Sequence, residues 1–157
     1  MLASYLGHFR HAQARRLEHA MWRRYPWLNL LFARTREGQW LPRWEPARVR
    51  SLQGQWRYFK RCFRGAVILF QIGRNVAVCE RDAEQIEPWF VRQALRVIRP
   101  GFVAVLEWPL AKLAAMRARL RRRAVPHVFV AEEGYLRGGL KRRVLRLVWL
   151  PQGLPAA

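Results

Sequence analysis

Arginine clusters are the feature of this sequence with the clearest chemical use. One cluster lies on the first expected helix, a second ends an expected basic helix, and a third follows a glycine-rich turn. Because guanidinium groups bind phosphate oxygens, these side chains are candidate contacts to a nucleic-acid backbone. In chain order they are Arg10, Arg15 and Arg16; Arg117, Arg121, Arg122 and Arg123; and Lys141, Arg142 and Arg143. A solvated helix end and a charged edge strand are the structural alternatives for the last two clusters.

The overall charge indicates the same kind of partner. The chain has 157 residues, with 30 Lys and Arg against 10 Asp and Glu, and a formal net charge of +20. Self-repulsion of this size destabilises a small folded body unless an anionic partner offsets it. Because 52% of the residues are hydrophobic, the chain is expected to fold rather than to remain a disordered tail. We therefore expect a folded nucleic-acid-binding protein.

The residue types needed for catalysis do not occur in a usable arrangement. Neither serine, Ser4 or Ser51, lies in a nucleophile elbow, and no Walker loop occurs. Asp82 is the only aspartate, so the paired carboxylates of polymerase and nuclease metal sites are not formed. Glu132 and Glu133 are consecutive residues of an expected strand, and their side chains should point to opposite faces. We expect no enzyme activity and no cofactor.

Cysteine content and hydropathy bear on the compartment. Cys62 and Cys79 are too few for a four-ligand metal site, and we expect both to be buried, reduced thiols. No apolar run reaches the roughly 18 residues that a membrane span requires. The N-terminus also lacks the apolar region of a secretory signal. These observations favour a cytoplasmic protein that does not contact a membrane.

The hydrophobic pattern predicts an α/β (α+β) chain with a short helical N-terminal segment. Apolar spacing predicts helices, and short β-rich apolar runs predict strands that include a hairpin turned at Gly73, Arg74 and Asn75. The expected helices cover 4–33, with a break at Pro26, and 47–62, 82–97 and 107–123. The expected strands cover 66–73, 76–80, 127–133 and 144–150, and residues 35–46 are expected to form a linker.

The N-terminal segment resembles part of a known enzyme family. The sequence SYLGHFRHAQARRL, Ser4 to Leu17, is similar to the thumb segment that follows the palm in group II intron-type and diversity-generating reverse transcriptases. The resemblance implies that the parent protein is an RNA-directed DNA polymerase. The palm, with its paired aspartates, is not present in this sequence, so the resemblance does not carry polymerase activity to the chain.

A second resemblance covers most of the remaining chain. YFKRCFRGAVILFQIGRNVAVCERDA, Tyr58 to Ala83, is similar to the opening helix, strand and hairpin of the N-terminal mismatch-recognition domain (domain I) of MutS proteins. The segments from Gly101 to Glu133 and from Gly138 to Gly153 resemble the later helix and strands of that domain in the same order. The resemblance implies a mixed-sheet fold and binding to duplex DNA.

The sequence departs from the MutS pattern at the positions that read a mismatch. In that family a phenylalanine, and a glutamate two residues later, follow the strand glycine. The aromatic ring wedges between bases, and the carboxylate binds the displaced base. Counted from Gly73, the corresponding positions are Asn75 and Ala77, which can neither stack nor accept that hydrogen bond. Mismatch reading is therefore not expected, whereas backbone binding by the neighbouring arginines is, and the hairpin at Arg74 and Asn75 is expected to approach the groove of the nucleic acid and to contact it.

Together these patterns predict a thumb-like segment over 1–34, a linker over 35–46, a MutS domain I-like nucleic-acid-binding domain over 47–153 and a tail over 154–157. The predicted role is a non-catalytic accessory region of a reverse-transcriptase-like protein that holds a DNA duplex or an RNA–DNA hybrid for an enzyme elsewhere. One alternative is a protein-interaction module that docks on a reverse transcriptase palm or a repair protein. Another is an orphan fragment, since the chain starts at a methionine inside a thumb-like helix.

Overall fold

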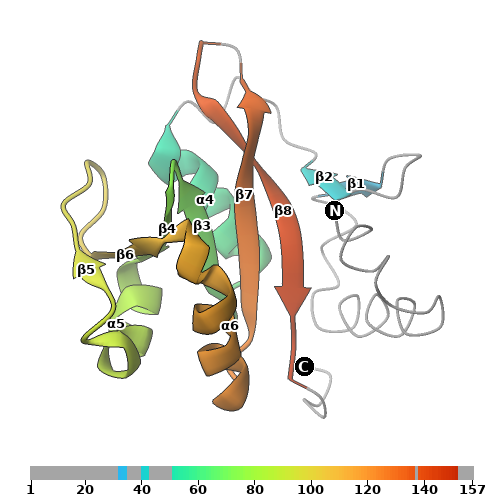
Figure 1. Ribbon diagram of the computed structural model, residues 1–157. Helices are drawn as coiled ribbons and strands as arrows, with labels where there is room; N and C mark the ends of the chain where they lie inside the picture. Colours follow the sequence, from blue (N-terminus) through green and yellow to red (C-terminus); the bar gives the residue numbers. More distant parts are fainter. Residues whose placement is uncertain (1–31, 35–39, 43–50, 137, 152–157) are drawn as a thin grey trace.

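The computed structural model describes residues 32–34, 40–42, 51–136 and 138–151 (Figure 1). Its helices are α4 (Leu52–Cys62), α5 (Glu80–Phe90), the short 3-10 helix η2 (Leu110–Lys112) and α6 (Leu113–Arg122). Its strands are β1 (Phe32–Arg34), β2 (Trp40–Pro42), β3 (Val67–Ile72), β4 (Asn75–Cys79), β5 (Leu95–Arg96), β6 (Val105–Pro109), β7 (His127–Tyr135) and β8 (Lys141–Trp149). Most of the predicted N-terminal helix, including Arg10, Arg15 and Arg16, lies outside the described residues.

A six-stranded mixed sheet forms the centre of the structure. The strand order is β5-β6-β4-β3-β7-β8, and β3 and β7 form the one parallel pair in that sheet. The remaining neighbours are antiparallel. The chain between the parallel strands β3 and β7 runs through β4, α5, β5 and β6, and helix α6 then brings it to the start of β7. The chain therefore has the predicted α+β architecture.

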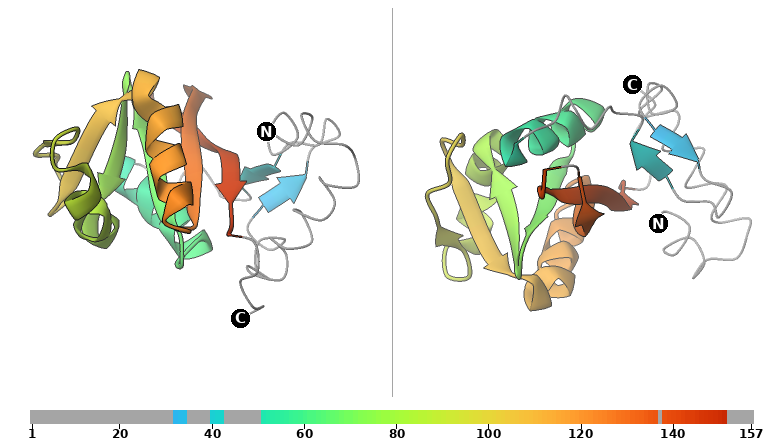
Figure 2. Two further views of the ribbon diagram at one scale, coloured as in Figure 1. Left: turned by 60° about the horizontal axis from the view of Figure 1, so that its bottom comes forward. Right: turned by 90° about the horizontal axis from the view of Figure 1, so that it is seen from above.

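Helices cover both faces of the sheet (Figure 2). On one face, Trp56, Phe59 and Phe63 of the α4 region pack against Ile68 and Phe70 of β3. On the other face, α5 and α6 bury a second set of side chains that includes Phe90, Met116 and Leu120. Because β3 and β4 are covered on both faces, their sequences are almost continuously apolar, which explains why they could be recognised as strands.

The predicted hairpin of β3 and β4 and the predicted helix before it, α4, are confirmed. Strands β3 and β4 pair in the register Phe70 with Ala77 and Ile72 with Asn75, and Gly73 turns the chain with φ of 60°. Glycine takes this conformation without steric cost. Helix α4 begins after Ser51, whose hydroxyl accepts a hydrogen bond of 2.9 Å from the Gly54 N–H. This N-cap places the start of the helix later than the predicted residue 47.

A buried carboxylate joins the two helical layers. Asp82 at the start of α5 accepts hydrogen bonds from the Ile68 N–H at 3.0 Å and from the Lys60 Nζ at 2.7 Å. Lys60 also donates to the carbonyl of Ala66 at 2.8 Å. Burial raises the pKa of Asp82, against the opposing effect of the Lys60 ammonium group. The only aspartate of the chain is thus used to fix α4, β3 and α5 to one another.

Two predicted helices differ from the structure. The helix predicted over 82–97 ends at Phe90, and Leu95–Arg96 form β5 instead. The helix predicted from residue 107 is wrong in its first part, because Val105–Pro109 form β6 between β4 and β5. Glu107 interrupts the apolar run of this strand and so conceals it in the sequence. Its carboxylate is nevertheless buried, because Arg99 and Asn75 both bind it.

The predicted linker is also corrected in part. Within residues 32–42, β1 and β2 form an antiparallel pair in which Ala33 faces Leu41. The end of the predicted N-terminal helix, at Phe32 and Ala33, is therefore extended backbone. Residues 40–42 of the predicted linker form β2, and residues 35–39 lie outside the described residues.

Both cysteines are free and buried, as predicted. Burial raises the pKa of the Cys62 thiol to about 12, so this side chain remains a neutral thiol at physiological pH. Among the described residues, no helix is long and apolar enough to cross a membrane.

A histidine lies in the core where β7 begins. His127 is fully buried, its ring is stacked on Trp149 at 5.2 Å, and its Nδ1 lies 2.9 Å from the carbonyl oxygen of Val125. Its Nε2 has no hydrogen-bond partner in the described part of the chain. Burial, with a smaller effect from Arg117 and Arg121, lowers the pKa of His127 to about 4. The imidazole is therefore neutral in the folded protein at pH 7.

This burial predicts a pH dependence of folding. Between pH 6.5 and about 4 the unfolded chain binds a proton on His127 that the folded chain does not. The free energy of unfolding should therefore fall by about 3 kcal/mol from this group as the pH drops through that window. Replacing His127 with Phe should remove this component, as measured by urea unfolding at several pH values. An identical pH slope in the variant and the parent chain would contradict the assignment.

Candidate nucleic-acid interface

A polar network fixes the turn between β3 and β4, which the sequence placed at the nucleic-acid interface. The Gly73 N–H donates to Glu132 of β7 at 2.6 Å, and the Gln71 side chain donates to the Gly73 carbonyl at 3.0 Å. Burial alone would raise the pKa of Glu132, but the Gly73 N–H, Lys141 and Arg143 together hold it below its ordinary value. The turn is therefore held by a charged carboxylate.

Arg143 belongs to this network and not to the surface. Its side chain is 4% exposed and donates to Glu132 at 2.9 Å and to the Lys141 carbonyl at 2.8 Å, and the guanidinium lies over the Phe70 ring. Burial lowers its pKa, against the effect of Glu132. Arg143 was predicted to contact phosphate, but its buried side chain binds groups of the domain itself. The basic run at 141–143 contained no signal that its third residue points inward.

The neighbours of Arg143 remain partly accessible. Lys141 pairs with Glu132 at 2.9 Å and its side chain is 46% exposed. Arg142 donates from Nε to the Glu133 carbonyl at 3.1 Å. Arg74 is exposed at the tip of the hairpin. These three cations share one end of the sheet with the turn that Glu132 holds.

The two positions corresponding to mismatch reading adjoin a single buried carboxylate. Asn75 donates to Glu107 of β6 at 3.0 Å, and Ala77 is the cross-strand neighbour of Glu107. Glu107 also pairs with Arg99. Ala77 is fully buried, so its position is part of the core in this chain. Neither side chain is free to contact a base.

The predicted arginines of α6 lie at the other end of the sheet. Arg121, Arg122 and Arg123 are exposed at the C-terminal end of the helix, where cations are favoured by the helix dipole. The guanidinium of Arg123 lies 5.1 Å from the centre of the Trp89 ring. Arg117, one turn earlier, is partly buried. The α6 cluster therefore presents three accessible cations.

The cations of the hairpin and those of α6 form two separate groups. The chain enters η2 beside the β3–β4 turn, where the Leu110 N–H donates to the Arg74 carbonyl at 2.8 Å. Ten residues of α6 then carry the chain away from that turn, a rise of about 15 Å. The hairpin cations and the α6 cations consequently lie near opposite ends of α6 (Figure 1). A single phosphate cannot contact both groups.

A further basic surface on α4 was not predicted. Arg57, Arg61 and Arg64 surround a shallow depression with Trp56 and Lys60 on the outer side of this helix. The three arginines are exposed; Arg57 and Arg61 lie one turn apart on α4, and Arg64 follows in the turn after the helix. That spacing was visible in the sequence and could have identified the surface.

The metal-ligating side chains of the described residues are scattered. These residues contain no group of three or more His, Cys, Asp or Glu side chains that could hold a metal ion. In comparisons with known proteins, the chain matches no protein family model and no curated protein. The exposed cations are therefore the main evidence on function.

The hairpin network can be tested by removing one charge. Glu132→Gln leaves the buried Arg143 without its counter-ion, and we expect a loss of about 3 kcal/mol in unfolding free energy. Hydrogen exchange at the Gly73 amide should accelerate as well. Glu133→Gln is the control: this residue pairs with the partly exposed Arg146, and its loss should cost less than about 1 kcal/mol. Equal effects of the two variants would contradict the network.

Proposed function

We propose that the chain is a non-catalytic nucleic-acid-binding accessory that holds a duplex through its backbone phosphates. The ligand is a DNA duplex or an RNA–DNA hybrid, and the chain serves a reverse-transcriptase-like protein whose palm lies elsewhere. Its resemblance to the mismatch-recognition domain of MutS supports duplex binding, and the replacement of both reading residues supports binding without mismatch selection.

One observation carries this proposal: most of the carboxylates of the domain already have a cation beside them, whereas many arginines are left on its surface. Asp82, Glu107 and Glu132 form ion pairs with their carboxylates largely buried, and Glu87 and Glu133 form ion pairs at the surface. The exposed stripes of α4 and α6 carry no carboxylate. Uncompensated arginines on a folded surface favour an anionic polymer, since they release counterions when they bind phosphates.

Binding to a protein partner is a second candidate, and a different surface favours it. The β5–β6 region exposes Leu95, Ile98 and Val103, of which Ile98 is completely exposed. Apolar side chains gathered in this way are typical of protein contact sites. Salt separates the two candidates, because phosphate binding weakens steeply with salt and apolar docking does not.

The α6 end provides the test. Changing Arg121, Arg122 and Arg123 to Gln should weaken duplex binding at least tenfold and reduce the slope of log K against log salt by roughly 2 to 3. Fluorescence anisotropy of the full chain with matched DNA, mismatched DNA and an RNA–DNA hybrid across a salt series measures both quantities. We expect matched and mismatched DNA to bind alike.

The control removes the same charge from the other face of the sheet. Replacing Arg57, Arg61 and Arg64 with Gln lowers the net charge equally, so a general charge effect would weaken binding to the same extent. A larger loss for the α6 variant assigns the contact to α6. Unchanged binding in the α6 variant would overturn that assignment, and salt-independent binding would favour the protein-docking alternative.

A further inference from the structure

The β5 edge of the sheet, residues 91–103, exposes large apolar side chains. Five such side chains are exposed among the described residues, and four of them belong to this edge: Val91, Leu95, Ile98 and Val103. Ile98 is 100% exposed and Val103 is 94% exposed. Apolar side chains gathered in this way are typical of surfaces that contact another protein molecule. The β5 edge therefore has the character of a protein interface.

The backbone of this edge can accept another strand. Strand β5 is the last strand of the sheet and pairs with β6 alone among the described strands. The Val97 N–H donates to the Val105 carbonyl at 3.1 Å, so the backbone of Val97 faces β6. Because successive residues of an antiparallel ladder alternate in direction, the backbone groups of Arg96 and Ile98 face away from the sheet. An exposed edge with such groups is a template for pairing with a second chain.

The charge near the β5 edge differs from that of the rest of the chain. Residues 80–107 contain five of the 10 Asp and Glu but only four of the 30 Lys and Arg, so this segment is almost neutral in a chain of net charge +20. Glu84 and Arg92 are exposed and have no ion-pair partner in the described part of the chain. Two copies of the chain repel each other elsewhere, whereas this surface lets them approach at little electrostatic cost.

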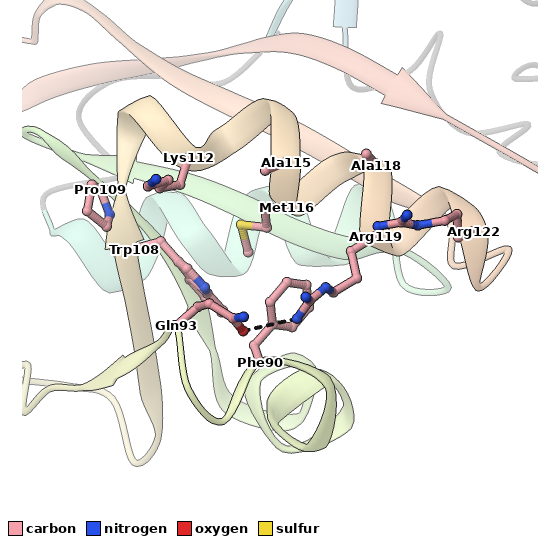
Figure 3. A pocket seen from close by; sticks show the side chains of 10 residues that line it. All are labelled: Phe90, Gln93, Trp108, Pro109, Lys112, Ala115, Met116, Ala118, Arg119 and Arg122. Carbon is pink, nitrogen blue, oxygen red and sulfur yellow. Dashed lines mark hydrogen bonds between the residues drawn. The ribbon is translucent and has the colours of Figure 1, made fainter.

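Helix α5 borders two hollows, and they differ in whether the domain itself fills them. In the pocket between α5, α6 and the end of β6, the Arg119 guanidinium lies over the Phe90 ring and donates to Gln93 at 3.0 Å (Figure 3). The groove between α5 and the β5 edge has a volume of about 410 Å³, and the exposed Ile98 and Val103 line it. The apolar side chains without a partner are therefore those of the groove.

We propose that two copies of this chain associate through their β5 edges about a two-fold axis. The two β5 strands then run antiparallel and join two six-stranded sheets into one. A two-fold contact is isologous, so the apolar side chains of one edge meet the same side chains of the other. Glu84 and Arg92 supply one acid and one base for a reciprocal contact.

This association is independent of the proposed function. Helices α4 and α6 cover the faces of the sheet and not the β5 edge, so their arginines stay accessible in the dimer (Figure 2). The dimer therefore forms without a nucleic acid and leaves the surfaces proposed to bind one free.

Sedimentation velocity of the nuclease-treated full chain tests the proposal. The 18.7 kDa chain should change from monomer to dimer as its concentration rises. Ile98→Asp combined with Val103→Asp should weaken the dimer by roughly tenfold or more, because unpaired carboxylates would be buried in the contact. Both residues lie outside the core, so the variant should keep its fold. Tyr135→Asp is the matched control: this apolar side chain is 69% exposed on β7, and its loss should leave the dimer unchanged.

Chemical cross-linking tests which surfaces meet. Cys62 and Cys79 are the only cysteines and both are buried, so Ile98→Cys provides one accessible thiol. A short bismaleimide should link two copies of Ile98→Cys into a covalent dimer and should leave Tyr135→Cys monomeric.

Salt separates this inference from the proposed function, because screening of the two positive chains should strengthen the dimer while it weakens duplex binding. A monomer at every concentration, a dimer unaffected by the double Asp variant, or equal cross-linking of the two Cys variants would overturn the inference.

Discussion

The ion pair between Glu132 and Arg143 is the interaction on which the end of the sheet that carries the β3–β4 turn depends. Arg143 is buried, and its donors are satisfied by Glu132 and by the backbone carbonyls of Gln71 and Lys141. Because the other Glu132 contacts reach the Gly73 amide and Lys141, one carboxylate determines where the β3–β4 turn lies relative to β7 and β8. A buried pair of this kind contributes specificity of arrangement more than net stability.

The same use of carboxylates inside the domain determines the character of its surface. Asp82 joins α4 and α5, and Glu107 holds Asn75 and Arg99. Each acid fixed in this way is unavailable to neutralise the arginines on the outer sides of α4 and α6. The surface is strongly positive because the chain has 30 Lys and Arg against 10 Asp and Glu, and each ion pair uses one cation together with one carboxylate.

Parts of the fold could be predicted because their sequence signals lie within one short segment and do not depend on contacts with distant residues. The apolar run of β3, the glycine turn at Gly73 and the heptad-like spacing of α4 all carry their structure locally. Strand β6 was missed because Glu107 looks solvent-exposed until Arg99 and Asn75 are brought to it. For the same reason Arg143 could not be separated from Lys141 and Arg142 by sequence. The pocket combines α5, β6 and α6, so no single segment could reveal it.

The surroundings of Asn75 and Ala77 limit how the β3–β4 hairpin could contact a base. Side chains two apart on a strand share a face, and both positions here adjoin Glu107, which is already occupied by Arg99. A residue in this environment stabilises the hairpin and cannot enter a groove. If the chain recognises an irregular nucleic acid, the recognition must therefore come from elsewhere in the domain.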